Sequence, residues 1–428
     1  MKFGIFYEHQ LPRPWEADSE HRLLKDALEQ VELADRLGID YVWEVEHHFL
    51  EEYSHSSAPE VFLAAASQRT KNIRLGHGIV QLPQGFNHSA RIAVRIATLD
   101  LVSDGRVDFG TGEASSEAEL GGFNVDRETK RAEWQEALDA ITRMFVEEPF
   151  AGYDGRFLKM PPRNVVPKPL QKPHPPLWVA CSRRDTIHMA ATRGVGALSF
   201  SFVEPSEAKL YVDDYYATIQ SAECIPGGFA VNPEVAIVTP LMCNADETEA
   251  IARGLDGGHF FGYSLGHYYV YGSHQPGRTN IWDEFQDRRS QFGFDRAIAS
   301  QTGMELAAKL WEEAFGSLRG AIGTPDQIRR FLRGYEEAGV DMVIFVSQSG
   351  RNRHEHIMES MELFAKEVMP EFKERDPAHR ERKRERLGHA IEAALARRQP
   401  ARTAPEYTIP SPPAPVPQGP PPAARTSA

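Results

Sequence analysis

Cysteine is scarce in this sequence, and long apolar runs are missing. The three cysteines, Cys181, Cys224 and Cys243, stand far apart among 428 residues. They are too few and too scattered for a disulfide framework or a zinc site, so we expect neither. No apolar run of about 18 residues occurs, which argues against a membrane-spanning helix. The start, MKFGIFYEH, lacks the basic residues and apolar stretch of a signal peptide, so we expect a cytoplasmic protein.

Positive charge is also in deficit. The chain has 48 Lys and Arg against 61 Asp and Glu, which gives a net charge of −13. Proteins that bind nucleic acid usually present an excess of basic residues, so this balance argues against nucleic acid as a partner. The remaining composition, 41% hydrophobic and 25% charged, is ordinary for a globular protein. Evidence for function must therefore come from local motifs.

The most informative stretch is YVWEVEHHF at residues 41–49. Its first half is rich in strand-forming residues, and it follows an amphipathic helix that ends at Gly38. Its second half carries two glutamates and the pair His47 and His48. Titratable groups at the carboxyl end of a barrel strand are typical of active sites. Because adjacent residues of an extended segment point to opposite sides, we expect only one of the two histidines to face the site.

Strand and helix patterns alternate along most of the chain. Eight apolar, strand-like segments are each followed by a helical pattern, and we place them at 2–7, 41–45, 73–82, 106–110, 177–180, 196–202, 235–243 and 341–346. This count predicts an α/β fold, a (β/α)8 TIM barrel. An open, doubly wound sheet is the competing fold, but it requires a glycine-rich turn after the first strand. Residues 7–10 read Tyr-Glu-His-Gln instead, which favours the barrel.

Two stretches stand outside this alternation. Residues 257–300, after the seventh strand, are rich in glycine and aromatic residues, and we expect a long, irregular insertion there. It would serve either as a lid or binding loop, or as a surface excursion or subunit contact. From residue 374 the chain is basic and then proline-rich, which predicts a disordered tail, although residues 380–398 could form a solvated helix. We therefore place one barrel domain at 1–373 and a dispensable tail at 374–428.

The stretch at 41–49, together with LGHGIVQLPQGFNHSARIAVRIATLDLVSDGRVDFGTG at 75–112, resembles the bacterial luciferase-like flavin monooxygenases. The resemblance covers about residues 1–373 and implies the same barrel fold. It implies that reduced FMN reacts with O2 to give a C4a-hydroperoxyflavin, which oxygenates a small organic substrate. A separate flavin reductase would supply the reduced FMN. We also expect an apolar or aromatic substrate and a homodimer or larger homo-oligomer.

The resemblance also implies roles for individual residues. His47 matches the family's catalytic histidine, and we expect it to manage protons, for which imidazole is suited near neutral pH. His77 and Gly78 fall where a family strand ends under the flavin ring, and Gly112 ends the next strand. Three further residues at strand ends are expected to line the substrate pocket: His9, His48 and Phe200.

A phosphate site is predicted where a strand ends and a helix begins, at ACSRRDT. Free N–H groups of a helix N-terminus, a hydroxyl and two arginines suit an anion. From the residues alone, a capping serine with solvated arginines is an equally weighted alternative. The resemblance favours the phosphate and implies FMN contacts from Ala180, Ser182 and Arg183. It adds Arg131, which matches a family arginine that contacts the FMN phosphate.

Glu113 departs from the family pattern, because the luciferases carry a basic residue at this position. Two alternatives to a monooxygenase stay open. One is hydride transfer with the deazaflavin coenzyme F420 on the same barrel, and the other is a non-catalytic flavin-binding subunit. We do not expect a metal site at the paired histidines, because consecutive strand residues diverge and no His-x-x-x-His spacing supports one.

Overall fold

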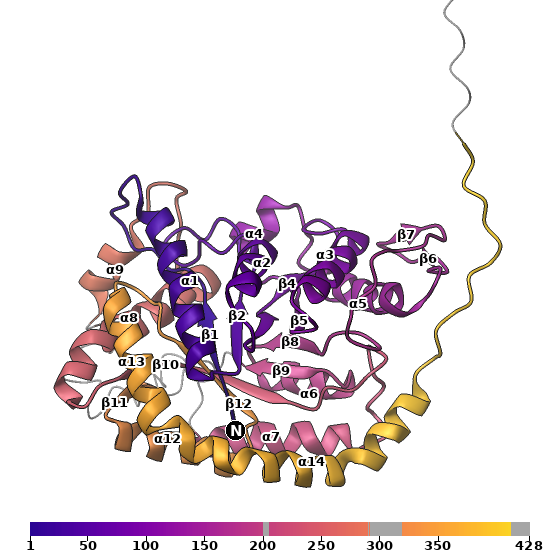
Figure 1. Ribbon diagram of the computed structural model, residues 1–428. Coiled ribbons are helices and arrows are strands. Elements are labelled where there is room, and N and C mark those ends of the chain that lie inside the picture. The colour runs from indigo at the N-terminus through magenta and orange to yellow at the C-terminus, as the bar shows by residue number, and fades with distance from the viewer. Residues whose placement is uncertain (200–204, 290, 292–318, 412–428) are drawn as a thin grey trace, which may run out of the picture.

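Parallel strands close into a barrel ringed by helices (Figure 1). The computed structural model describes residues 1–199, 205–289, 291 and 319–411. The barrel strands are β1 (Lys2–Tyr7), β2 (Tyr41–Glu44), β3 (Arg74–His77), β5 (Val107–Gly112), β8 (Leu177–Cys181), β9 (Gly196–Ser199), β10 (Val235–Cys243) and β12 (Met342–Val346). Each pairs in parallel with the next, and β12 pairs with β1. The (β/α)8 prediction is confirmed.

Large aromatic side chains fill the interior of the barrel. Trp43 of β2 and Trp178 of β8 are fully buried and meet edge to face, with ring centroids 5.3 Å apart. Gly76 of β3 makes room for them, since a Cβ at this position would lie 2.2 Å from the Trp43 ring. The preceding residue of each strand faces the helices, as Val42 and Leu75 do. Because the interior is packed, ligand chemistry is confined to the loops at the strand ends.

The helices that follow the strands cover the outside of the barrel. α1 (Ser19–Leu37) shows how the sequence specifies them: Ala27, Val31 and Ala34 lie at helical spacing and are buried, and Gly38 ends the helix with a φ of 82°. The other covering helices are α2 (Pro59–Arg69), α3 (Ser89–Val102), α5 (Lys130–Val146), α6 (Arg184–Thr192), α7 (Pro205–Ile219), α12 (Pro325–Ala338) and α13 (His354–Glu367).

Four short strands complete the described strands: β4 (Val80–Gln81), β6 (Tyr153–Asp154), β7 (Lys159–Met160) and β11 (Ala321–Gly323). β4 pairs with β5, β11 pairs with β10, and β6 and β7 form a separate antiparallel pair. None of the helices in the described part of the chain combines the length and the apolar character that a membrane crossing requires. Phe200, which we expected in the substrate pocket, lies outside the described residues.

The described part of the insertion that follows β10, residues 257–289, is largely helical where we expected irregular chain, and residues 292–300 lie outside the described residues. α8 (Glu247–Gly266) continues into a π-helical turn, η1 (His267–Tyr271), and α9 (Ile281–Arg288) follows. The glycines of α8 serve close packing. A Cβ at Gly254 would lie 2.4 Å from the Met242 side chain, and a Cβ at Gly257 would lie 2.6 Å from the Ser349 carbonyl oxygen. The high glycine content of this stretch had therefore wrongly indicated an irregular chain.

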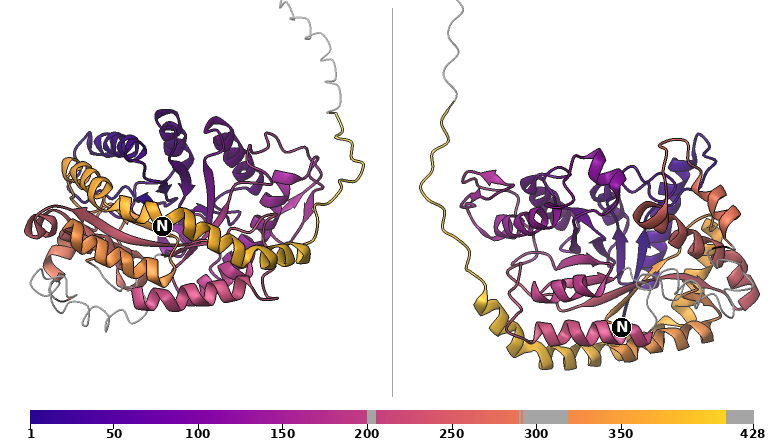
Figure 2. Two further views of the ribbon diagram at one scale, coloured as in Figure 1. Left: turned by 60° about the horizontal axis from the view of Figure 1, so that its bottom comes forward. Right: turned by 180° about the vertical axis from the view of Figure 1, so that it is seen from behind.

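The prediction of a disordered tail was wrong for residues 374–397. They belong to α14 (Met369–Arg397), which runs across the end of the barrel where the N-terminus lies (Figure 1, Figure 2). Leu387 and Ala394 of this helix are buried in the core. Residues 398–411 have no regular secondary structure, and residues 412–428 lie outside the described residues.

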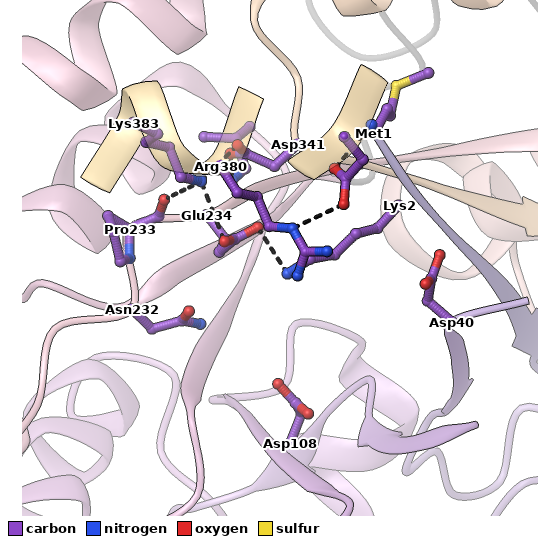
Figure 3. Close-up of polar contacts among 12 residues, drawn as sticks. Met1, Lys2, Asp40, Asp108, Asn232, Pro233, Glu234, Asp341, Arg380 and Lys383 are labelled. Carbon is purple, nitrogen blue, oxygen red and sulfur yellow. Dashed lines mark hydrogen bonds and ion pairs between the residues drawn. The ribbon is translucent and has the colours of Figure 1, made fainter. Parts of the chain in front are cut away.

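Basic residues of α14 pair with acidic groups at this end of the barrel. Lys383 Nζ donates to the Pro233 carbonyl oxygen at 2.9 Å and lies 3.1 Å from Glu234 Oε1 (Figure 3). It also pairs with Asp341, just before β12. The same basic residues had predicted a solvated tail, because their acidic partners lie far away in the sequence.

Candidate functional site

His47 follows β2 at the carboxyl-terminal end of the barrel, and its backbone and ring are both held in place. Its N–H donates to the Ser56 carbonyl oxygen at 2.8 Å. Its Nδ1 lies 2.9 Å from Glu119 Oε1, and its Nε2 lies 3.7 Å from Glu8 Oε2. The imidazole therefore lies between two carboxylates, and only 15% of the side chain is exposed.

Glu119 is supplied by α4 (Glu117–Gly122), a short helix between β5 and α5. The Ser116 hydroxyl caps this helix, accepting the Glu119 N–H at 3.3 Å and donating to Glu119 Oε2 at 2.7 Å. Glu119 Oε1 also accepts the N–H of His48 at 3.1 Å. Burial alone would raise the pKa of Glu119, but His47 and these hydrogen bonds outweigh burial and lower the pKa. Glu119 is therefore the permanent negative charge of the site.

Glu8 directly follows β1 and faces the other ring nitrogen of His47. Tyr53 Oη donates to Glu8 Oε1 at 2.9 Å, and Ser54 Oγ donates to the Glu8 carbonyl oxygen at 2.8 Å. Burial raises the pKa of Glu8 to about 7, and the neighbouring His47 opposes this rise. A carboxyl group that titrates near neutral pH can both release and accept a proton under ordinary conditions.

The protonation of His47 depends on these two carboxylates. Burial lowers the pKa of His47, but the charges of Glu119 and Glu8 outweigh burial and raise it to about 9. At neutral pH the ring is therefore an imidazolium, which donates from both nitrogens. Because the three groups interact at short range, their protons leave in steps that belong to the whole cluster.

Aromatic side chains cover His47. Its ring lies 5.8 Å from the Tyr53 ring and 6.4 Å from the ring of Tyr269, which η1 supplies. Burial raises the pKa of both phenols well above the ordinary value, so they stay neutral. The insertion after β10 thus lies against the candidate histidine, which favours the lid over the surface excursion. Single π-helical turns are frequent at functional sites.

The loop that carries His47 also anchors this insertion. Glu52 accepts the N–H of Trp282 at 3.2 Å and the N–H of Arg13 at 2.8 Å. Glu51 accepts the N–H of Gly277 at 2.7 Å. These two glutamates follow the histidine motif directly, so a shift of the insertion would be transmitted to the segment that positions the imidazole.

The two adjacent histidines diverge as predicted, but neither His48 nor His9 joins His47. The His48 ring packs against the Phe123 ring at 4.8 Å, within a cluster of aromatic side chains beyond α4. His9 is fully buried against Phe62 of α2, with ring centroids 4.9 Å apart. The expected roles of His9 and His48 in the substrate pocket stay predictions. Successive side chains of an extended segment point to opposite sides, so Glu8 points towards His47 and the neighbouring His9 points away from it.

The expected cofactor contacts at the ends of β3 and β5 involve backbone and glycine. The His77 side chain is buried among groups of α2 and α3, and burial lowers its pKa to about 4. It points away from the interior, so only its backbone is available at the strand end. A Cβ at Gly78 would lie 3.2 Å from Phe6, and a Cβ at Gly112 would lie 2.3 Å from Ile79. Both glycines thus permit close packing at the top of the barrel.

The predicted phosphate residues gather at the neighbouring strands β5 and β8. Ser182 and Arg183 follow β8, and their side chains are exposed. Thr186 Oγ1 donates to the Arg183 carbonyl oxygen at 2.7 Å and fixes the turn into α6, whose first N–H groups have no acceptor within the helix. Ala180 is half-buried at the strand end. Cys181 is buried, and burial raises its pKa to about 12, so it is a packing group.

Arg131, in the first turn of α5, completes this group. The Trp134 indole N–H donates to Thr111 Oγ1 at 3.0 Å and fixes α5 against β5. The hydrogen bond and the charge of Glu113, and to a smaller extent the charge of Asp185 in the first turn of α6, outweigh burial and raise the pKa of Arg131. Arg131 also pairs directly with Glu113, the residue that departs from the family pattern.

Several buried polar atoms at this end of the barrel have no hydrogen-bond partner among the described residues. They include Gln81 Oε1, Ser347 Oγ and Glu8 Oε2, and the last of these has only the longer ion pair with His47 Nε2 at 3.7 Å. Such atoms are rare in folded proteins and call for a ligand or an ordered water. A polar ring ligand with an anionic group at the turn after β8 fits this set of donors and acceptors.

Sequence reasoning missed Glu8, Glu119 and Tyr269. Glu8 stands in the polar tip 7–10, beside His9, which we predicted in its place. Glu119 and Tyr269 carry no comparable signal, because each reaches His47 only through the fold of a separate helical segment.

Comparison with known proteins identifies the family to which the chain is similar. A model of the family described as luciferase-like monooxygenase matches residues 1–342. The oxygenase component of a flavin-dependent trigonelline monooxygenase from Acinetobacter baylyi is 26% identical over 381 residues, which cover 87% of this chain and 96% of that protein. Two relatives from Sinorhizobium fredii are matched over only about half of their length.

Solved structures share the same barrel. Monooxygenase RslO1 from Streptomyces bottropensis superimposes with a TM-score of 0.68 at 25% identity, covering 87% of this chain and all of that one. The oxygenating constituent of 3,6-diketocamphane monooxygenase from Pseudomonas putida, in complex with FMN, gives a TM-score of 0.65 at 20% identity, covering 86% and 98%. F420-dependent enzymes have this fold too. Likeness at such low identity shows the fold alone.

Proposed function

Because the chain belongs to the luciferase-like monooxygenase family, we propose that it uses reduced FMN and O2 to oxygenate a small organic molecule. The observation that carries the proposal is His47, held as an imidazolium between Glu8 and Glu119 at the carboxyl-terminal end of the barrel. A proton donor with a charged partner on each side is what an oxygen-transfer site requires of its protein.

The residues present fit a flavin mononucleotide. The unpartnered polar atoms at the strand ends would meet the ring heteroatoms, and Ser182, Arg183 and Arg131 would hold the phosphate. When bound, the reduced flavin supplies the electrons that activate O2. The chain supplies the binding groups, the protons and the exclusion of water.

The proton chemistry belongs to His47 and Glu8. The imidazolium carries a proton on each ring nitrogen, and its Nε2 lies 3.7 Å from Glu8 Oε2. Glu8, with its pKa raised by burial to about 7, is suited to return a proton to the ring. Tyr53 and Tyr269 cover the imidazole and limit the access of water. Their rings also favour an apolar or aromatic substrate.

The proposal includes a separate reductase as the source of reduced FMN. The relative from Acinetobacter baylyi is named as an oxygenase component, which supports a two-component arrangement for this chain as well. We further propose that the protein works as a homodimer or a larger homo-oligomer.

Coenzyme F420 is the alternative cofactor, because solved F420-dependent enzymes share the fold. Equilibrium titrations of the protein with FMN and with F420, followed by flavin fluorescence and by absorbance, separate the two. We expect FMN to bind and F420 to bind at least tenfold more weakly, a difference of about 1.4 kcal/mol in binding free energy. Tighter binding of F420, with hydride transfer in the absence of O2, would replace the monooxygenase by an F420-dependent enzyme.

A further inference from the structure

Two cations in the first turn of α5 share one carboxylate. Arg131 Nε and Nη2 donate to the two oxygens of Glu113 at 2.6 Å and 2.8 Å. Lys130 Nζ donates to Glu113 Oε1 at 3.0 Å and to the Ala114 carbonyl oxygen at 2.8 Å. The Glu113 side chain is only 19% exposed, whereas Arg131 keeps 40% exposure. Glu113 therefore accepts hydrogen bonds from both cations on their buried side.

This arrangement requires an anion. Positive side chains in the first turn of a helix face the positive end of its dipole, so Lys130 and Arg131 are unfavourable there unless a negative group compensates them. Glu113 is such a group, and it binds Arg131 through two parallel N–H···O bonds. A phosphate prefers the same two-point geometry on a guanidinium. A carboxylate and a phosphate can therefore substitute for one another at Arg131.

The position of this triad relates it to the cofactor. Glu113 directly follows β5, and the turn after the neighbouring strand β8 carries Ser182 and Arg183. Asp185, in the same turn, acts electrostatically on Arg131. We propose that Glu113 competes with the phosphate of FMN for Arg131 and Lys130, and so weakens the affinity of this protein for FMN. This inference rests on the proposed function and names a residue that sets cofactor affinity.

The competition has a consequence for how the flavin is used. A phosphate that binds must displace a neighbouring carboxylate or accept its repulsion, and either effect favours release. The flavin would then exchange between turnovers rather than remain bound as a resident group. Exchange suits a protein that receives reduced flavin from another protein.

Glu113→Gln tests the competition, because glutamine keeps the size of the side chain and removes its charge. We expect FMN to bind about tenfold more tightly than to the wild type, the scale on which one charge-assisted hydrogen bond changes a binding equilibrium. Riboflavin, which has no phosphate, should bind both proteins equally. Inorganic phosphate should also compete with FMN at lower concentration in the variant. Thermal melting of each protein verifies that it is folded.

Two controls make the test specific. Glu117→Gln removes an exposed carboxylate of α4 that pairs with Arg127, and it should leave FMN affinity unchanged. When Arg131 is also replaced by alanine, Glu113→Gln should lose most of its gain in affinity for FMN.

The possible results separate the two proposals. Weaker or unchanged FMN binding by Glu113→Gln, with riboflavin unaffected, would show that Glu113 orients Arg131, and the competition would be refuted. Equal preference for FMN and riboflavin in all variants would also refute it, because the phosphate would then lie elsewhere. Failure of the wild type to bind either flavin would instead overturn the proposed function.

Discussion

At the scale of single residues, the charge on His47 links the stability of the fold to its chemistry. The ring nitrogens lie 2.9 Å from Glu119 and 3.7 Å from Glu8, so the imidazolium stabilises two buried carboxyl groups. The charges of Glu119 and Glu8 outweigh burial and raise the pKa of His47 to about 9, whereas burial raises the pKa of Glu8 to about 7 against the opposing effect of His47. Perturbed pKa values of this kind concentrate at functional sites.

The pH dependence of stability follows from the raised pKa of His47. Its pKa is about 9 in the folded protein against an ordinary value of 6.5. The stabilising contribution is therefore complete below the ordinary value and is lost as the pH rises through about 9. We expect His47→Gln to lower the melting temperature more at about pH 6 than at about pH 10. Differential scanning fluorimetry at both pH values measures this difference.

The matched control is His389→Gln, which replaces an exposed histidine of α14 and should change the melting temperature at neither pH. An equal loss for His47→Gln at both pH values would mean that the ring stabilises the fold by packing alone.

At the scale of elements, the turn between β8 and α6 is where we propose that the phosphate of FMN binds. Ser182 and Arg183 are exposed there, at the start of a helix with free N–H groups. We expect the double substitution Ser182→Ala with Arg183→Ala to weaken FMN about tenfold or more, since charge-assisted contacts to the phosphate are lost. Riboflavin should bind as it does to the wild type. Fluorescence titration compares the two ligands, and equal losses for both would place the phosphate elsewhere.

α14 is the element for which the sequence pattern and the structure differ most. Lys383, with 15% of its side chain exposed, compensates Glu234 and Asp341. Lys383→Met leaves these carboxylates without their lysine, and we expect it to lower the free energy of unfolding by about 3 kcal/mol, the scale for breaking a buried ion pair. Arg384→Met is the control, because Arg384 is exposed and its ion pair is with Glu381 of its own helix. Urea unfolding measures both.

Truncation after Lys373 should likewise lower the melting temperature, in contrast to the dispensable tail that the composition predicted. Unchanged unfolding midpoints for Lys383→Met and for the truncated chain would show that α14 packs too weakly to matter.

At the scale of the whole molecule, the barrel was predictable because regular alternation of strands and helices is a local signal. β1, β2 and β10 lie where their apolar patterns predicted them. The second half of α8 and the packing of α14 against the barrel were not predictable in this way, because glycines and charges there are explained by distant partners such as Met242 and Asp341.

The candidate site shows the same limit. His47 was identified from its own motif, and the family resemblance supplied its role. Glu8 and Glu119 became visible only when the fold brought the ends of β1 and β2 together with α4. The resemblance also did not predict that Glu113 pairs with Arg131.

The central claim is that this protein binds reduced FMN and delivers it to O2 with protons managed by His47. Rapid mixing of the protein with reduced FMN under anaerobic conditions, and then with oxygenated buffer, tests this claim directly. We expect an oxygen-dependent absorbance change of bound flavin that is distinct from free-flavin oxidation. His47→Ala should still bind reduced FMN but turn over about 100-fold more slowly, as expected for loss of a general acid–base group. Oxidation of reduced FMN identical with and without the wild-type protein would contradict the account.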